Sequence, residues 1–94
     1  MEMPTDSTVS DRTLAILRCP NDGSQLTRAN TAQVTELNAA IAAHRLRDRS
    51  GKPVERSISG GLVRASGDLL YPIVDGIPVM LYDEAISLEQ LNPA

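Results

Sequence analysis

The fold is decided between residues 69 and 81, where the chain reads Leu69-Leu70-Tyr71-Pro72-Ile73-Val74-Asp75-Gly76-Ile77-Pro78-Val79-Met80-Leu81. Two apolar runs, at 69–74 and 77–82, are separated only by Asp75 and Gly76. An Asp-Gly pair between apolar runs strongly favours a two-residue hairpin turn, because both residues tolerate positive φ angles. This segment therefore predicts an antiparallel β-hairpin.

Further strands are predicted upstream of this hairpin. Residues 62–65 form a strand that is separated from the hairpin by the turn-forming sequence Ser-Gly-Asp at 66–68. Residues 25–28 form a short earlier strand. Residues 54–58 alternate apolar and polar side chains, and this period of two predicts another half-buried strand.

Helix caps and apolar spacing predict three helices. Ser10 caps a short first helix, Asn30 or Thr31 caps a long central helix that runs to about Arg49, and Asp83 caps a short last helix. The expected fold class is α+β, with a small antiparallel sheet of about four strands, a short N-terminal helix, an inserted central helix and a short C-terminal helix.

The length and composition favour a single domain. The chain has 94 residues, of which 41% are hydrophobic and 22% are charged, close to the usage of ordinary globular proteins. Residues 1–9 have no apolar periodicity and are expected to be a disordered tail, which leaves 10–94 as the domain. The core is expected to be thin and aliphatic, because there is no Phe or Trp and only two Tyr, of which Tyr71 is assigned to it.

Charge and cysteine content restrict the class of protein. Nine Lys plus Arg against twelve Asp plus Glu give a net charge of −3, which argues against a main role in holding nucleic acid. A single cysteine excludes an internal disulfide, and the N-terminus lacks the pattern of a secretory signal. No run approaches the ~18–20 apolar residues of a spanning helix. The prediction is a soluble, cytoplasmic protein without a membrane segment.

Two blocks of the sequence, at 14–26 and 62–84, carry a resemblance to a known family. The segment 69–81 closely resembles the signature of the tRNA-methyltransferase activator subunit-like family, small zinc-ribbon-like proteins that include short bacterial YcaR-like relatives. The sequence LAILRCP at 14–20 looks like the opening helix and first knuckle of that family. Leu62-Val63-Arg64 looks like the strand that precedes its second knuckle.

The resemblance implies a compact domain that assists a larger protein. The family fold is an antiparallel sheet with a terminal helix, and residues of about 30–53 look like the helical insertion found in the activator subunits. In those subunits the domain holds and shields a methyltransferase and performs no chemistry itself. The resemblance therefore implies a non-catalytic adaptor or activator that binds a protein partner such as an S-adenosylmethionine (SAM)-dependent methyltransferase.

The chain departs from the zinc-binding members of this family at the ligand positions. Tetrahedral zinc needs four ligands such as thiolates or imidazoles. Of the expected positions, Cys19 is kept, Asp22 stands where the second cysteine would fall, and Arg64 stands where the third would fall. We therefore expect a degenerate site that holds no metal and no other cofactor, in which an ion pair between Asp22 and Arg64 replaces metal bonds.

The sequence offers no catalytic constellation. Cys19 is interpreted as a buried structural thiol, because the single histidine, His44, lies in a different predicted element. His44 falls on the apolar stripe of the central helix, where a packed histidine is the simpler interpretation. Gly60 and Gly61 interrupt the strand rhythm without the lysine of a phosphate-binding loop. The prediction is that the protein is not an enzyme and has no catalytic residues.

A cluster of basic residues opens an alternative function. The cluster consists of Arg45, Arg47, Arg49, Lys52 and Arg56. One interpretation is the solvated end of the central helix, interleaved with acids. The alternative is a metal-free zinc-ribbon relative that binds nucleic acid through this basic insertion.

The predicted partner-binding segment is Ile77, Pro78, Val79, Met80 and Leu81. An apolar strand presents alternate side chains to the core and outward, and a proline without an N–H suits a strand at a sheet edge. Such an edge invites a partner strand, with Val79 and Met80 as the outward side chains to test. Two alternatives stay open: pairing of this strand with a second copy in a homodimer, and burial of both its faces.

Overall fold

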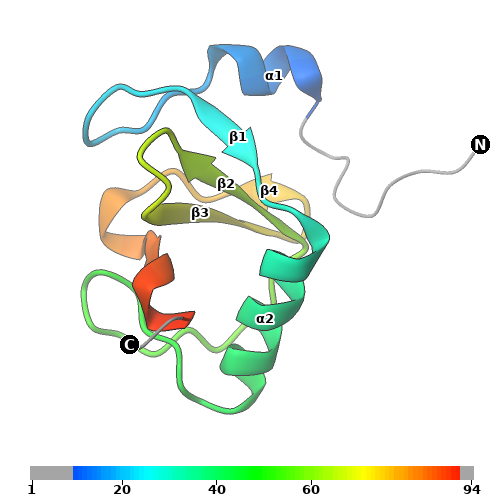
Figure 1. Ribbon diagram of the computed structural model, residues 1–94, viewed down its shortest axis with the longest axis vertical. Helices are drawn as coiled ribbons and strands as arrows, with labels where there is room; N and C mark the ends of the chain where they lie inside the picture. Colours follow the sequence, from blue (N-terminus) through cyan, green and yellow to red (C-terminus); the bar gives the residue numbers. More distant parts are fainter. Residues whose placement is uncertain (1–9, 92–94) are drawn as a thin grey trace, which may run out of the picture.

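The computed structural model describes residues 10–91, and the predicted tail at 1–9 lies outside them. Along the chain the elements are α1 (Asp11–Ile16), β1 (Leu26–Arg28), α2 (Thr31–Ala42), β2 (Gly60–Arg64), β3 (Leu69–Val74), β4 (Ile77–Pro78), the 3-10 helix η1 (Tyr82–Glu84), β5 (Ile86–Ser87) and the 3-10 helix η2 (Leu88–Leu91). Figure 1 shows one curled sheet with α2 running beside it. The predicted α+β class is confirmed.

All strand pairs in the sheet are antiparallel. The order is β1-β2-β3-β4, and β5 pairs with β3 as well. The first half of β3 pairs with β5 (Leu70 opposite Ile86), and its second half pairs with β4 (Ile73 opposite Pro78). Both edges of β3 are therefore occupied, and β1 and the short β4 and β5 form the borders of the sheet.

The decisive hairpin forms at the predicted turn. Val74 pairs with Ile77, so the loop contains only Asp75 and Gly76. Their φ angles are 52° and 81°. Two successive positive φ angles are those of a type I′ turn, whose twist matches that of the flanking strands.

Hydrophobic side chains pack on both faces of the sheet. The first group, here the α2-side core, consists of Ala29, Leu37, Ala40, Ile41, Leu46, Ile58, Val63, Leu70 and Ile86. The second, here the α1-side core, consists of Cys19, Leu26, Leu62, Leu69, Tyr71, Ile73 and Ala85. Neighbours in a strand point to opposite faces, so Leu62 and Val63 enter different cores. Tyr71 is fully buried, as predicted.

The central helix is shorter than predicted. Asn30 caps it, and the Asn30 and Gln33 side chains form a reciprocal capping box. The helix ends at Ala42 instead of near residue 49, because His44 adopts a φ of 59°. The His44 and Arg45 amides donate back to Ile41 and Ala40, which is the Schellman arrangement of a helix end. His44 is exposed rather than packed on the helix.

The predicted strand at 54–58 is wrong. Ile58 is buried as the alternation implied, but its backbone pairs with a side chain instead of a neighbouring strand. The Asn38 amide donates to the Ile58 carbonyl at 3.0 Å and accepts from the Ile58 amide at 2.8 Å. This clamp fastens the loop to α2. Gly60 and Gly61, predicted to break the strand rhythm, are instead the first residues of β2.

The C-terminal part also differs from the prediction. The strand expected over 77–82 stops at Pro78, although the Val79 amide still donates to the Pro72 carbonyl. In place of a helix capped by Asp83, the chain forms η1, β5 and η2. Ile86 is fully buried because β5 pairs with β3 through Ile86 and Leu70. Burial of Ile86 therefore does not require the predicted helix. Within residues 10–91 no helix has the length and apolarity needed to cross a membrane.

Candidate functional site

The first knuckle is held by its own backbone. The Cys19 amide donates to the Ser24 carbonyl at 2.9 Å, and the Gly23 amide donates back to the Cys19 carbonyl at 2.8 Å. The Asp22 carboxylate accepts from the Ser24 amide at 2.9 Å, an Asx turn. These bonds to Ser24 hold the pKa of Asp22 below its ordinary value. Gly23 takes a φ of 75°, which completes the turn.

Arg64 links this knuckle to the β2–β3 turn. Its guanidinium binds Asp68 through two parallel bonds, from Nε at 2.7 Å and from Nη2 at 2.8 Å. Its Nη1 lies 3.0 Å from the Asn21 Oδ1 and 3.5 Å from the Asp22 carboxylate. The predicted ion pair between Asp22 and Arg64 is therefore present.

The sequence reasoning missed the closer partner of Arg64. Asp68 follows Arg64 by four residues across a turn, and this spacing of opposite charges could have predicted the ion pair. The Arg64 side chain is only 13% exposed, so these contacts are partly shielded from water. Hydrogen bonds from Arg64, with a further bond from Ser66, hold the pKa of Asp68 well below its ordinary value.

Cys19 and Tyr71 meet beneath this cluster. Both are buried, and the Cys19 sulfur lies 2.9 Å from the Tyr71 hydroxyl oxygen in a hydrogen bond. The Arg64 Nη1 lies 3.9 Å from the same sulfur. Burial, reinforced by the thiol, raises the pKa of Tyr71 well above its ordinary value. The thiol is thus in a structural position, between a phenol and a guanidinium.

These residues do not fit a zinc ion. A cation at the knuckle would sit beside the Arg64 guanidinium, which already occupies the space next to the Cys19 sulfur. Across residues 10–91, no three or more His, Cys, Asp or Glu side chains are grouped so as to hold a metal. Hydrogen bonds and ion pairs therefore hold the knuckle together.

The predicted partner-binding segment is partly exposed. Ile77 is 66% exposed and Leu81 is 58% exposed, whereas Pro78, Val79 and Met80 are half-buried. Met80 packs on the α1-side core. Met80 therefore faces the core and not the partner, Val79 is half-buried, and the most exposed side chains of the segment are Ile77 and Leu81.

A hollow of about 270 Å³ lies beside this segment. Its apolar lining comes from Pro53, Val54, Ile58, Pro72, Val74, Val79 and Ile86. The charged residues that line it are Asp48, Glu55, Arg56 and Glu84, and Arg56 forms an ion pair with Asp75 of the hairpin turn. An apolar hollow next to exposed aliphatic side chains can receive a side chain of a docked protein.

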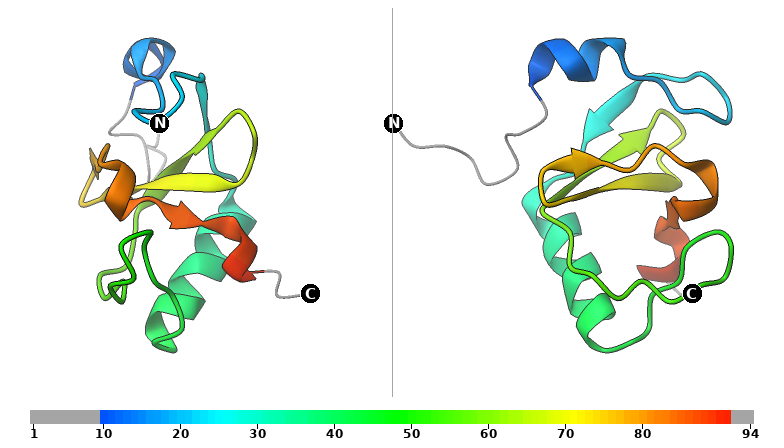
Figure 2. Two further views of the ribbon diagram at one scale, coloured as in Figure 1. Left: turned by 90° about the vertical axis from the view of Figure 1, so that its left-hand side faces the viewer. Right: turned by 180° about the vertical axis from the view of Figure 1, so that it is seen from behind.

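α1 packs on the α1-side core, on the other face of the sheet from this hollow. Leu14 and Leu17, in and just after α1, pack on the α1-side core together with Met80 and Tyr82. In Figure 2, right, α1 and the segment from β4 to η1 both lie on the side that faces the viewer. Ile16 of α1 is 73% exposed, so each of these two segments presents a large aliphatic side chain to solvent.

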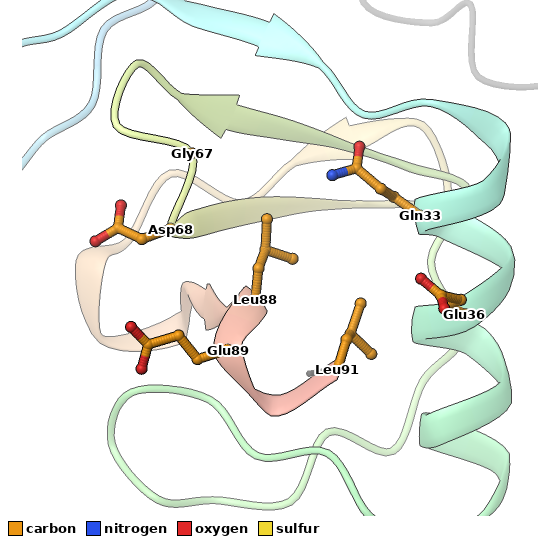
Figure 3. A pocket seen from close by; sticks show the side chains of 7 residues that line it. All are labelled: Gln33, Glu36, Gly67, Asp68, Leu88, Glu89 and Leu91. Carbon is orange, nitrogen blue, oxygen red and sulfur yellow. The ribbon is translucent and has the colours of Figure 1, made fainter. Parts of the chain in front are cut away.

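A second hollow, of about 430 Å³, lies between α2 and η2. In Figure 3, Gln33 and Glu36 project from α2 toward Leu88 and Leu91, while the Asp68 and Glu89 carboxylates lie on the opposite side. The carboxylates do not converge, and Asp68 is already bound by Arg64. This hollow contains none of the predicted site residues.

The comparisons with known proteins give a structural relative. Neither a protein-family model nor a curated protein sequence matches the chain. The solution NMR structure of XF2673 from Xylella fastidiosa superimposes with a TM-score of 0.69 at 29% sequence identity, covering 86% of this chain and 84% of that one. The chain is therefore an α+β protein that is structurally similar to XF2673 over most of its length.

Proposed function

We propose that the protein is a non-catalytic adaptor that binds a larger protein through Ile77 and Leu81 and the adjacent hollow. The supporting observation is the exposure of these two side chains on the segment that follows β3. Exposed large aliphatic residues beside a pocket are typical of protein interfaces. The resemblance to the tRNA-methyltransferase activator subunit-like family makes a SAM-dependent methyltransferase the proposed partner.

Side chains, more than strand pairing, are proposed to hold the partner. β4 spans two residues, and Pro78 has no N–H to donate. The main-chain pairing expected from the sequence is therefore limited at this edge. An apolar side chain of the partner placed in the hollow would contact Val79 and Pro72.

A non-catalytic role agrees with the placement of the two candidate nucleophilic or basic groups. Cys19 is buried in the α1-side core, whereas His44 is exposed at the end of α2. Neither therefore activates the other in the way that a thiol–imidazole pair requires.

The test compares two substitutions at the proposed surface with one matched control. The tagged chain is purified from the native organism, copurified methyltransferases are identified by mass spectrometry, and binding is measured with the purified pair. We expect Ile77→Asp/Leu81→Asp to lose the methyltransferase, while Ile16→Asp, at a somewhat more exposed position on α1, retains it. Denaturation curves confirm that each variant is folded.

Retention of the methyltransferase by the double variant, or equal loss in the control, would remove the proposal. The alternative of a homodimer predicts a dimer in sedimentation of the isolated chain that Ile77→Asp dissociates. A strictly monomeric wild type at high concentration excludes that alternative.

A further inference from the structure

The segment at 45–49 alternates between the core and solvent. Leu46 is 1% exposed and Asp48 is half-buried, whereas Arg45, Arg47 and Arg49 are exposed. Isolated β-bridges at Arg47 and Asp48 show that the backbone is extended here. Alternate residues of an extended chain point to the same side, about 6.4–6.8 Å apart. Arg45 and Arg47 therefore point to the same side, and Arg49 follows them at the start of a turn; these three exposed arginines are called here the arginine row.

The backbone that carries the arginine row is fastened to the C-terminal part of the chain. The Gln90 amide accepts from the Arg47 amide at 2.9 Å and donates to the Arg47 carbonyl at 2.8 Å. The Arg49 amide donates to the Ala85 carbonyl at 3.0 Å. In Figure 1 this green loop lies beside the red η2. A ligand of the row therefore does not have to order the loop first.

The single acid within the row is engaged by its own loop. The Asp48 carboxylate accepts bonds from the Ser50 amide at 2.9 Å, the Ser50 hydroxyl at 2.6 Å and the Lys52 amide at 3.1 Å. Burial raises the pKa of Asp48, but these bonds outweigh it and lower the pKa overall. Asp48 thus shapes the turn and does not pair with the arginines.

The guanidinium groups of the row keep donors available. The Arg49 guanidinium stacks on Tyr82, with 4.2 Å between its Cζ and the ring centroid. Arg47 donates from Nη1 to the Gly51 carbonyl at 2.9 Å. Of the carboxylates in the described part of the chain, none forms an ion pair with these three arginines. Arg56 and Arg64, in contrast, are paired with Asp75 and Asp68. A stacked guanidinium still presents its in-plane N–H groups outward.

We propose that the arginine row binds the phosphodiester backbone of a nucleic acid strand, a function separate from the proposed adaptor role. Guanidinium groups bind phosphate through paired N–H donors, and a group of neighbouring cations suits a strand with one negative charge at each step. A nucleic acid carries this charge at every nucleotide, whereas a polypeptide carries it only where its sequence places Asp or Glu. The net charge of −3 opposes the interaction, so the binding is weak and depends on salt.

The expected salt dependence follows from the number of cations. The row and the neighbouring Lys52 supply three or four contacts, and each single-strand phosphate contact contributes about −0.7 to the slope of log Kobs against log[salt]. The slope is therefore about −2 to −3. Raising the salt from about 50 to about 200 mM then weakens binding roughly 20- to 50-fold.

The test is fluorescence anisotropy of the full chain with a labelled single-stranded RNA oligonucleotide. We expect Arg45→Gln/Arg47→Gln to reduce the slope by about 1.4, because two phosphate contacts are removed. The control, Arg12→Gln/Arg18→Gln in and just after α1, removes the same charge and should keep the slope of the wild type. Urea denaturation checks that both pairs of substitutions leave the fold intact, and unlabelled DNA competes if the phosphodiester chemistry is the common feature.

Three results would overturn the proposal: no salt-sensitive binding to RNA, equal losses in the row and control variants, or tighter binding to poly-glutamate than to RNA. The last result would instead assign the row to an acidic protein. Ile77→Asp/Leu81→Asp should still bind RNA, and Arg45→Gln/Arg47→Gln should still bind the methyltransferase. The outcomes for the two surfaces are therefore distinguishable.

Discussion

Replacing Gly61 with alanine should destabilise the protein through a collision with one side chain. A Cβ atom on Gly61 would lie 2.5, 2.7 and 2.8 Å from Cδ1, Cγ and Cδ2 of Leu70. Carbon atoms in contact are normally about 3.5–4.0 Å apart. Because Cγ itself is too close, rotation about χ2 of Leu70 does not relieve the overlap, and the side chain must shift by about 1 Å.

Leu70 has little room for such a shift. It is completely buried in the α2-side core, where Val63 and Ile86 belong to the same cluster. Overpacking of a well-packed core costs about 1–3 kcal/mol. Loss of glycine freedom in the unfolded chain offsets about 0.4–1 kcal/mol of this. The net cost of Gly61→Ala is about 1–2 kcal/mol, or a decrease in Tm of about 4–16 °C for a domain of this size.

A double-mutant cycle with Leu70→Ala isolates the collision. Leu70→Ala by itself should cost about 2–5 kcal/mol, because it leaves a cavity. In that background the methyl group added at position 61 enters the vacated space, so Gly61→Ala should be neutral or stabilising, a favourable coupling of at least about 1 kcal/mol. The free energies of unfolding come from urea titrations, and Leu70→Val provides a milder background if Leu70→Ala does not fold.

The matched control is Gly23→Ala. Gly23 has a φ of 75° and no atom within 4 Å of an added Cβ, so its cost comes from the backbone conformation and not from a collision. That cost should be the same with and without Leu70. If the cost of Gly61→Ala persists undiminished in the Leu70→Ala background, the explanation by overpacking is wrong.

Three further predictions concern the helix end and the knuckle. His44→Gly should stabilise the protein by about 0.5–1 kcal/mol in urea titrations, because glycine adopts a positive φ without strain; an unchanged or lower midpoint would contradict this. Tyr71 has a raised pKa in the folded state, so its contribution to stability is complete below the unfolded value of about 10 and is lost as the pH rises above it. In an ultraviolet titration the Tyr71 phenolate should appear only when the protein unfolds, and Tyr71→Phe should remove the absorbance change that accompanies unfolding. Asp68 has a lowered pKa, so its stabilisation is complete above about pH 4 and is lost as the pH falls below it. Asp68→Asn should therefore flatten the loss of stability in acid, and an unchanged acid profile would count against the role of its pair with Arg64.

Local sequence determined several parts of this fold. The turn at Asp75 and Gly76 requires only two residues that accept positive φ, and the Asn30 cap requires only an acceptor three residues before a free amide. The strand at 69–74 was predicted at its observed bounds, because its side chains are apolar throughout and suit burial on both faces. The pair between Asp22 and Arg64, in contrast, joins distant parts of the chain and was expected only from the family resemblance.

Tertiary structure determined those segments in which a backbone group could hydrogen-bond to more than one partner. The alternation of apolar and polar residues at 54–58 fits both a strand and a loop. The side-chain amide of Asn38, 20 residues away, forms the hydrogen bonds with the Ile58 backbone that a neighbouring strand would otherwise form. The exposure of Ile77 and Leu81 depends on the point at which the chain stops pairing with β3, which is after the two residues of β4. The arginine row exists because α2 ends at Ala42 and Gln90 holds Arg47 in an extended backbone. Local sequence determines turns and caps because their partners are a few residues away, whereas contacts between distant residues are determined only when the whole chain packs.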